Sequence, residues 1–347
     1  MTEESVRIPG PAAGRRGVVG TVRMLLELVK FEHSIFALPY AYIGALFAAA
    51  SVGAHAAGVA VPDAPPGLGA RAAQGVALHE PYSRLLRVSA SGAVWPSWEA
   101  ILWVTVAMVG ARAFAFVVNR AVDKEIDARN PRTAGRAVPT GLIKAWELWV
   151  FALVMLAAYG VAVWRLHPVT WWLSPIPLVV FVVYPYLKRF TRLCHLWLGA
   201  ALGLAPVGAW VAVTGRLSDW VPWVMGVAVA LWTAGFDIIY ATQDIEVDRR
   251  DGIHSVPADL GVAAGLRRTR WLHAATVTLL AAAGGGLGAG WAYFAGVALA
   301  AGLLAYENAI VSADDLSRVN AAFFTVNGII AIVVFVGALA DVAIHSV

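Results

Sequence analysis

Long apolar runs with few charges are the feature that most limits what this chain can fold into. A helix needs roughly 20 mostly apolar residues to cross a bilayer, and most of the runs reach that length. Only 14% of the 347 residues are charged, whereas a soluble domain carries about a quarter. The sequence therefore predicts an all-α integral membrane protein with nine transmembrane helices. The runs cover approximately residues 34–53, 98–118, 145–163, 168–187, 195–214, 220–240, 271–287, 289–306 and 320–344.

Two polar segments stand outside these runs. Residues 1–20 are rich in Gly, Pro and Arg and predict a mobile N-terminal segment. They do not predict a cleavable signal peptide, because the apolar run that follows is too long for the hydrophobic region of one. Residues 54–97 are rich in Ala, Gly and Pro, which predicts a long surface loop rather than a span. We therefore expect a single transmembrane domain over residues 21–347.

Lys and Arg are distributed unevenly between the two sides that these spans define. With the N-terminus inside, most of the 26 Lys and Arg fall before the first span and after the second, fourth, sixth and eighth spans. Since cytoplasmic loops carry an excess of positive charge, we expect these segments to face the cytoplasm at an inner (plasma) membrane. The basic residues on the opposite side are Arg71, Arg84, Arg87, Arg165 and Arg216.

Two segments, at the inner ends of the second and sixth spans, carry acidic side chains at four-residue spacing. Residues four apart lie on one face of a helix, where like charges repel each other. A chain that repeats this arrangement twice predicts a bound cation that offsets the repulsion. The first acidic segment has Asn119, Asp123 and Asp127 at this spacing, and the second has Tyr240, Asp244 and Asp248, with Asp237 seven residues before Asp244.

The residue types indicate which cation is bound. The single cysteine, Cys194, excludes an internal disulfide and a CxxC metal cluster. Oxygen ligands favour magnesium or calcium, and magnesium is usually held by one or two carboxylates together with substrate phosphates. Two acidic segments on one cavity therefore predict a diphosphate bridged by Mg²⁺ ions. For one segment alone, a solvated helix end paired with arginines is the better interpretation; the repeat at matching depth favours the metal.

Basic side chains lie close to both segments in the sequence. Arginine binds phosphate oxygens through its planar fork, and lysine binds them as a point charge. Those predicted to bind the diphosphate are Arg132, Arg136, Lys188 and Arg189.

Arg112 and His33 are two further candidates. Arg112 lies inside an apolar span, seven residues before Asn119, and a charge in that position indicates function by default. It meets either an acidic group of the substrate or an aspartate of the protein, and the sequence favours neither. His33 stands at the inner start of the first span, where we expect it to line the same cavity, although an interfacial histidine is more often structural.

The acidic segments resemble those of the UbiA superfamily of membrane prenyltransferases. Arg112 and the first acidic segment are similar to the family's NxxxDxxxD motif, and the second acidic segment is similar to its DxxxD motif. The run Tyr184–Arg189 is similar to the basic segment after the fourth span. The resemblance implies nine helices around a central cavity, Mg²⁺ as cofactor, and transfer of an isoprenoid from its diphosphate to an acceptor.

The first span suggests the acceptor. Its residues Lys30–Pro39 resemble the subgroup of the futalosine route to menaquinone, whose acceptor is a carboxynaphthoate. A 4-hydroxybenzoate-type acceptor for ubiquinone stays open, as do haem, dihydroxynaphthoate and a glycerol lipid. The partners expected are polyprenyl diphosphate, the aromatic acid and membrane lipid, with no nucleic acid and no obligate protein partner. A transporter is the alternative from another class, and it predicts inverted symmetry between the halves of the chain.

Three residues of the second acidic segment are predicted to be catalytic. An allylic cation develops at C1 of the isoprenoid, and aromatic rings stabilise cations, so we assign Tyr240 to this role. The acceptor ring, held near Arg112 or His33, attacks as an electron-rich arene. Asp237 or Asp244 then takes the ring proton.

Overall fold

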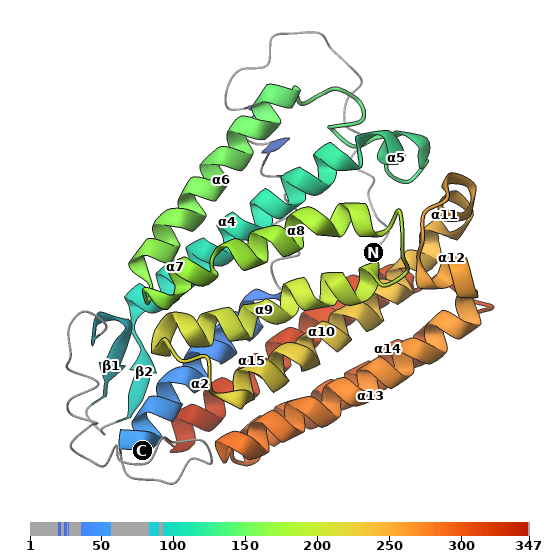
Figure 1. Cartoon of the computed structure of the whole chain (residues 1–347). Coiled ribbons are helices and arrows are strands. Elements are labelled where there is room, and N and C mark those ends of the chain that lie inside the picture. Colours follow the sequence, from blue (N-terminus) through green and yellow to red (C-terminus); the bar gives the residue numbers. More distant parts are fainter. Residues whose placement is uncertain are drawn as a thin grey trace.

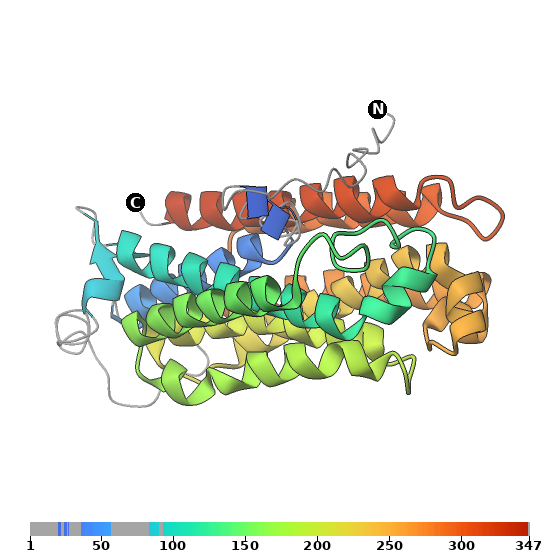
Figure 2. The same cartoon turned by 90° about the horizontal axis from the view of Figure 1, so that it is seen from above.

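The computed structural model describes residues 20–21, 24–25, 27, 36–56, 83–89 and 93–345. Predictions for residues 1–19, for His33 and for most of the 54–97 connector concern residues outside this set. Long helices run side by side along the molecule (Figure 1), and Figure 2 shows the same helices from above. The helices are α2 (Leu38–Ala56), α4 (Trp98–Val122), α5 (Lys124–Arg129), α6 (Ala145–Arg165), α7 (Val169–Leu173), α8 (Pro175–Leu187), α9 (Cys194–Thr214), α10 (Trp220–Ala241), η3 (Thr242–Asp244), α11 (Ile245–Asp251), α12 (Val256–Leu260), α13 (Val262–Leu287), α14 (Trp291–Ile310), η4 (Ala321–Val326) and α15 (Asn327–His345).

The all-α membrane fold predicted from the apolar runs is confirmed. Each expected span coincides with a helix or a pair of consecutive helices. Within the described part of the chain, seven helical segments are long and apolar enough to cross a membrane. The shorter α2 and the long α13 are outside this group, and α13 carries Arg267, Arg268 and Arg270 in its first turns. Exposed tryptophans near both ends of α6, Trp146 and Trp164, are typical of residues at the two membrane interfaces.

The connector 54–97 contains structure that its composition does not predict. Helix α2 continues to Ala56, and a short 3₁₀ turn, η2 (Ser83–Leu85), precedes an antiparallel hairpin. Its strands are β1 (Leu86–Val88) and β2 (Val94–Pro96), with Arg87 opposite Trp95. The hairpin lies at the end of the molecule opposite α5 and α11 (Figure 1).

Helices α9 and α10 pack closely because small residues face each other. A Cβ atom added at Gly199 would collide with the backbone carbonyl of Ala230, and one at Gly203 with that of Gly226. These two glycines form a GxxxG pair, which allows two helix backbones to approach in a membrane. The close contact fixes α10, and with it the second acidic segment, against α9.

A buried polar network holds the last helix. The segment η4 is a π-helix, and the side chain of Asn327 at its end donates to the carbonyl of Ala322 at 3.0 Å and to Glu307 at 2.9 Å. Its amide oxygen accepts from the indole N–H of Trp232 at 2.6 Å. Because Trp232, Glu307 and Asn327 are all fully buried, these bonds satisfy groups that would otherwise be costly inside an apolar bundle.

Phe323, which η4 contributes, connects this core with the second acidic segment. Its ring centroid lies 4.1 Å from that of Tyr240 and 5.2 Å from that of Phe236. The π-helix therefore helps to set where the Tyr240 ring stands.

Candidate functional site

The first acidic segment straddles the junction of α4 and α5. Asp123 ends α4 with φ −92° and ψ 6°, and it is almost fully buried. The N–H of Asp123 donates to the carbonyl of Asn119 at 2.9 Å, and the N–H of Asp127 donates to that of Asp123 at 2.8 Å. The backbone hydrogen bonds between residues four apart therefore continue across the junction of α4 and α5. Asp123 and Asp127 are both buried at this end of the molecule.

The second acidic segment has the same construction. Helix α10 passes through the 3₁₀ turn η3 into α11, and Asp244 stands at this junction with φ −112° and ψ 8°. The bridge region of backbone conformation is sparsely populated and frequent at active sites. Each acidic segment thus places its central aspartate at a joint between two helices.

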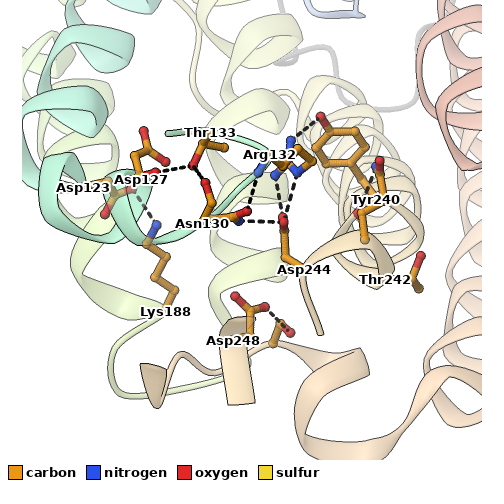
Figure 3. A network of polar contacts seen from close by, with 12 residues as sticks. Asp123, Asp127, Asn130, Arg132, Thr133, Lys188, Tyr240, Thr242, Asp244 and Asp248 are labelled. Carbon is orange, nitrogen blue, oxygen red and sulfur yellow. Dashed lines mark hydrogen bonds and ion pairs between the residues drawn. The ribbon is translucent and has the colours of Figure 1, made fainter. Parts of the chain in front are cut away.

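The two acidic segments meet through residues that follow the first one. Asn130 donates to Asp244 at 2.8 Å, and Arg132 donates hydrogen bonds from its Nε and Nη2 atoms to both carboxylate oxygens of Asp244 (Figure 3). Nη1 of Arg132 also donates to the Tyr240 hydroxyl at 3.0 Å, and the guanidinium carbon lies 5.2 Å from the centre of that ring. The residues that follow the first acidic segment thus lie in direct contact with the second.

The remaining basic residues predicted at the site contact the first acidic segment. Lys188, which follows α8, forms an ion pair with Asp123, and Nη1 of Arg136 lies 3.0 Å from the Asp127 carboxylate. Arg120 approaches the same carboxylate at 3.1 Å, and Arg189 donates to the carbonyl of Val122 at 2.9 Å. Asp123, Asp127 and Asp244, three of the predicted metal ligands, are therefore each paired with a basic side chain in this structure.

Burial and charge oppose each other at Asp123. Burial raises the pKa of its carboxyl group, and the Lys188 ammonium group acts in the opposite direction without cancelling the effect. The Oδ1 atom of Asp123 is buried, accepts no hydrogen bond, and lies 3.7 Å from Nη2 of Arg189. A buried carboxylate oxygen without a hydrogen bond is costly and leaves a hard oxygen atom free to bind a cation.

Arg132 is close enough to both acidic segments for their charges to change its pKa. Burial lowers its pKa, but the hydrogen bond to Asp244 and the charges of Asp244 and Asp127 outweigh that effect and raise the pKa above its ordinary value. Arg132 is therefore a fixed positive charge between the two acidic segments.

Asp237 and Asp248 are held by partners that lie elsewhere in the chain. His195, the second residue of α9, contacts the Asp237 carboxylate at 2.7 Å. The hydroxyl of Ser255, the N-cap of α12, donates to Asp248 at 3.0 Å. These contacts fix two acids that the sequence predicts to be functional.

The other predicted residues are less closely connected to this network. Arg112 lies within α4 with its guanidinium carbon 5.2 Å from the Phe116 ring centre, and its Nε has no hydrogen-bond partner. Among the residues that the structure describes, it forms no ion pair, which leaves the internal-pair interpretation without support. The Asn119 side chain is half-buried, and His33 lies outside the described residues.

No ready-made metal cluster is present in the described part of the chain, in the sense of three or more His, Cys, Asp or Glu side chains that converge on one point. The donor set nonetheless fits a hard divalent cation shared with a substrate. Magnesium is usually bound by one or two carboxylates plus phosphate oxygens rather than by a cage of protein ligands. Carboxylates at two facing joints, one with a free buried oxygen, match that mode of binding.

Sequence reasoning missed Asn130, His195 and Ser255. Asn130 and His195 act on acids far away in the sequence, Asp244 and Asp237. Ser255 acts on Asp248, which lies only seven residues before it. Asn130 follows the first acidic segment directly, and that position is the one signal in the sequence that pointed to it.

The chain is similar in sequence to one known protein family and to individual known proteins. The profile of the UbiA prenyltransferase family matches residues 85–329. The chain is 31% identical over 246 residues to a 4-hydroxybenzoate octaprenyltransferase of Saccharophagus degradans, covering 71% of this chain and 81% of that protein. It is 34% identical over 207 residues to the enzyme of that name from Vibrio cholerae, covering 58% and 70%.

Solved structures show the same fold. A UbiA homolog from Aeropyrum pernix, in its apo form, has a TM-score of 0.70 at 30% identity, with 90% of this chain and 98% of that chain covered. A UbiA homolog from Archaeoglobus fulgidus bound to GPP and Mg²⁺ has a TM-score of 0.60 at 20% identity, with 92% and 99% covered.

Proposed function

The chain belongs to the UbiA prenyltransferase family, and we propose from this premise that it joins a polyprenyl group to an aromatic carboxylic acid in quinone biosynthesis. The C1–O bond of a polyprenyl diphosphate breaks, a bond forms between C1 and a ring carbon of the acceptor, and that carbon loses its proton. The observation that carries the proposal is the meeting of the two acidic segments, in which Asp123 and Asp244 stand at matching helix joints and Arg132 spans the gap.

We propose that Mg²⁺ is held between these segments together with the diphosphate. The residues that would hold it are Asn119, Asp123 and Asp127 on one side and Asp244 and Asp248 on the other. When bound, the metal neutralises the diphosphate and so makes it a better leaving group. A fold relative that binds GPP and Mg²⁺ supports this assignment.

The basic residues bind the diphosphate in this proposal. Lys188 and Arg132 are paired with Asp123 and Asp244 in the structure, and phosphate oxygens offer them stronger, charge-assisted partners. Arg136 and Arg189 lie beside the first acidic segment and complete the positive side of the site. A diphosphate that draws these cations toward itself frees the carboxylates for the metal.

Tyr240 and its neighbours line the position where the allylic cation forms. An aromatic ring attracts a cation over its face, and the Arg132 guanidinium already occupies such a position on Tyr240. Apolar side chains around the ring, such as Phe323 and Phe324, exclude water that would otherwise trap the cation as an alcohol.

We propose that the carboxylate of the acceptor binds Arg112. Its Nε is buried without a hydrogen bond, so an acidic ligand would satisfy a donor that costs free energy in the empty site. The relatives named 4-hydroxybenzoate octaprenyltransferase favour a 4-hydroxybenzoate-type acceptor, and the segment Lys30–Pro39 favours a carboxynaphthoate. The excess of Lys and Arg near the site places it on the cytoplasmic side of the inner membrane in this proposal.

An assay with membranes that contain the purified chain tests the proposal. Radiolabelled polyprenyl diphosphate is supplied with Mg²⁺ and either 4-hydroxybenzoate or a carboxynaphthoate, and the prenylated acid is identified by mass spectrometry. We expect product with one of the two acids and none after addition of excess chelator. Full activity in Asp123→Ala, in Asp244→Ala or in chelator would reject the mechanism, and flux of substrate without any prenylated product would indicate a transporter.

A further inference from the structure

His195 makes two hydrogen bonds that together determine where its proton is. It is 3% exposed. Its Nδ1 lies 2.7 Å from Oδ2 of Asp237, and its Nε2 lies 3.1 Å from the backbone nitrogen of Val256. A backbone N–H only donates, so Nε2 must be the acceptor and carry no proton. The proton is therefore on Nδ1, and His195 donates it to Asp237.

From this geometry we propose that His195 is a positioning residue that holds Asp237 as the acceptor of the ring proton. The bond from Nδ1 fixes the carboxylate rotamer and engages Oδ2. Within the described part of the chain, the structure shows no other hydrogen bond to Asp237, so Oδ1 is available to the substrate. The side chain of Asp237 is 16% exposed and that of His195 is 4% exposed, which places the carboxylate on the accessible side of the pair.

Asp244 is the other candidate for the acceptor of the ring proton, but its carboxylate already accepts hydrogen bonds from other residues. Its two oxygens accept hydrogen bonds from Asn130 and from the fork of Arg132. It also stands at the helix joint that matches that of Asp123, which assigns it to the metal and diphosphate. Asp237, on α10, lies two turns before Asp244 and is therefore farther from the charged joint. An acceptor ring that attacks C1 of the isoprenoid would have to lie in this region.

One short segment, Ser255–Val256, orients both His195 and Asp248. The hydroxyl of Ser255 donates to Asp248, and the N–H of Val256 donates to His195. Just before them, the N–H of His254 donates to the carbonyl of Lys188 at 2.7 Å. The start of α12 thus fixes an acid that we assign to the metal and, through His195, the acid that we assign to the proton.

The ring proton leaves after the new carbon–carbon bond has formed. Attack of the ring on C1 leaves the ring with a positive charge, and the ring carbon still carries its hydrogen. That proton passes to Oδ1 of Asp237, the C–H electron pair restores the aromatic ring, and Asp237 later releases the proton to solvent. This inference rests on the proposed function, because it requires an aromatic acceptor.

Two substitutions separate positioning from a structural role. His195→Asn retains an N–H donor near the place of Nδ1 but does not reach Val256, whereas His195→Gln reaches Val256 but removes the donor to Asp237. If His195 positions Asp237, the Asn variant should keep most of the turnover, and the Gln variant should lose about 10-fold or more of kcat, since a placed base contributes about 10²–10⁴-fold. The KM for the prenyl diphosphate should change little in either variant.

The decisive measurement uses an acceptor deuterated at the ring carbon that is prenylated. A misplaced base slows proton removal, so His195→Gln should show a primary isotope effect on kcat that the wild-type protein and His195→Asn lack. The control is His167→Gln, since His167 lies between α6 and α7, outside both acidic segments; it should behave as wild type. Equal losses in the Asn and Gln variants, or a larger loss in Asn, with no new isotope effect would overturn the proposal. If wild type forms no prenylated acid, the proposed function itself fails, and the role of His195 falls with it.

Discussion

Asp123 and Asp244 occupy matching joints, each between two consecutive helices, with φ and ψ of −92° and 6° at Asp123 and −112° and 8° at Asp244. One ends α4 and the other ends the turn after α10, and more than a hundred residues separate them in the sequence. Arg132 connects the two regions through its fork on Asp244. Figure 3 shows Asp123 paired with Lys188, and Asp244 in contact with Asn130 and Arg132.

Substitution of either joint aspartate by asparagine should abolish most of the activity. Asp123→Asn and Asp244→Asn keep the size of the side chain but remove the charge that a divalent cation needs. We expect a fall in kcat of about 100-fold or more, comparable to the loss of a group that stabilises developing charge. Glu125→Gln is the matched control because Glu125 is exposed on α5 beside Asp123. Similar rates for Asp123→Asn and Glu125→Gln would contradict the assignment.

Replacement of Arg132 by lysine tests whether substrate binding needs the planar guanidinium group of Arg132 or only its positive charge. Lysine keeps the positive charge but cannot grip two oxygens of Asp244 and also reach the Tyr240 hydroxyl. A charge-assisted hydrogen bond contributes about 1.5–3 kcal/mol, so Arg132→Lys should raise the KM for the prenyl diphosphate by roughly 10-fold. Arg268→Lys, an exposed substitution on α13, serves as the control. An unchanged KM in Arg132→Lys would show that the fork is not used for substrate.

Long apolar runs predict the helices well because bilayer thickness fixes their length, but they do not predict where a helix breaks. The sequence places Asn119, Asp123 and Asp127 on one face of a continuous helix, whereas the chain turns at Asp123. The hairpin at Leu86–Pro96 was missed because strands of three residues carry too little periodicity to detect. His195 was missed because its role depends on residues 42 and 61 positions away, which no local pattern encodes.

Two glycines of α9 provide a matched test of helix packing. A Cβ on Gly199 would meet the backbone carbonyl of Ala230, whereas nothing lies within 4 Å of a Cβ placed on Gly208. Gly199→Ala should therefore destabilise the protein by about 1–3 kcal/mol through overpacking. Gly208→Ala should be neutral or slightly stabilising, because alanine favours the helix. Thermal unfolding in detergent compares the two, and equal midpoints would show that α9 and α10 can separate without cost.

Asn327 should be among the most sensitive positions of the bundle that lie away from the acidic segments. Asn327→Ala leaves Trp232, Glu307 and the Ala322 carbonyl without the partners they have now. Each buried group that loses its hydrogen bond costs about 1–3 kcal/mol, so a large fall in the unfolding temperature is expected. Thr278→Ala is the control, since Thr278 is exposed and its hydroxyl bonds only within its own helix. A variant of Asn327 as stable as wild type would show that the network contributes little.

Arg112 gives the sharpest test of acceptor recognition. If its buried guanidinium binds the carboxylate of the acceptor, Arg112→Leu should raise the KM for the aromatic acid by about 10- to 100-fold, the equivalent of one charge-assisted hydrogen bond of about 1.5–3 kcal/mol. The KM for the prenyl diphosphate should not change, because Arg112 lies within α4, about three turns before the joint at Asp123. A phenol without the carboxylate adds a second comparison: wild type should strongly prefer the acid, and Arg112→Leu should lose that preference. Arg165→Leu, an exposed change at the other end of the molecule, is the control. A variant that still discriminates between acid and phenol would assign recognition of the carboxylate to another residue.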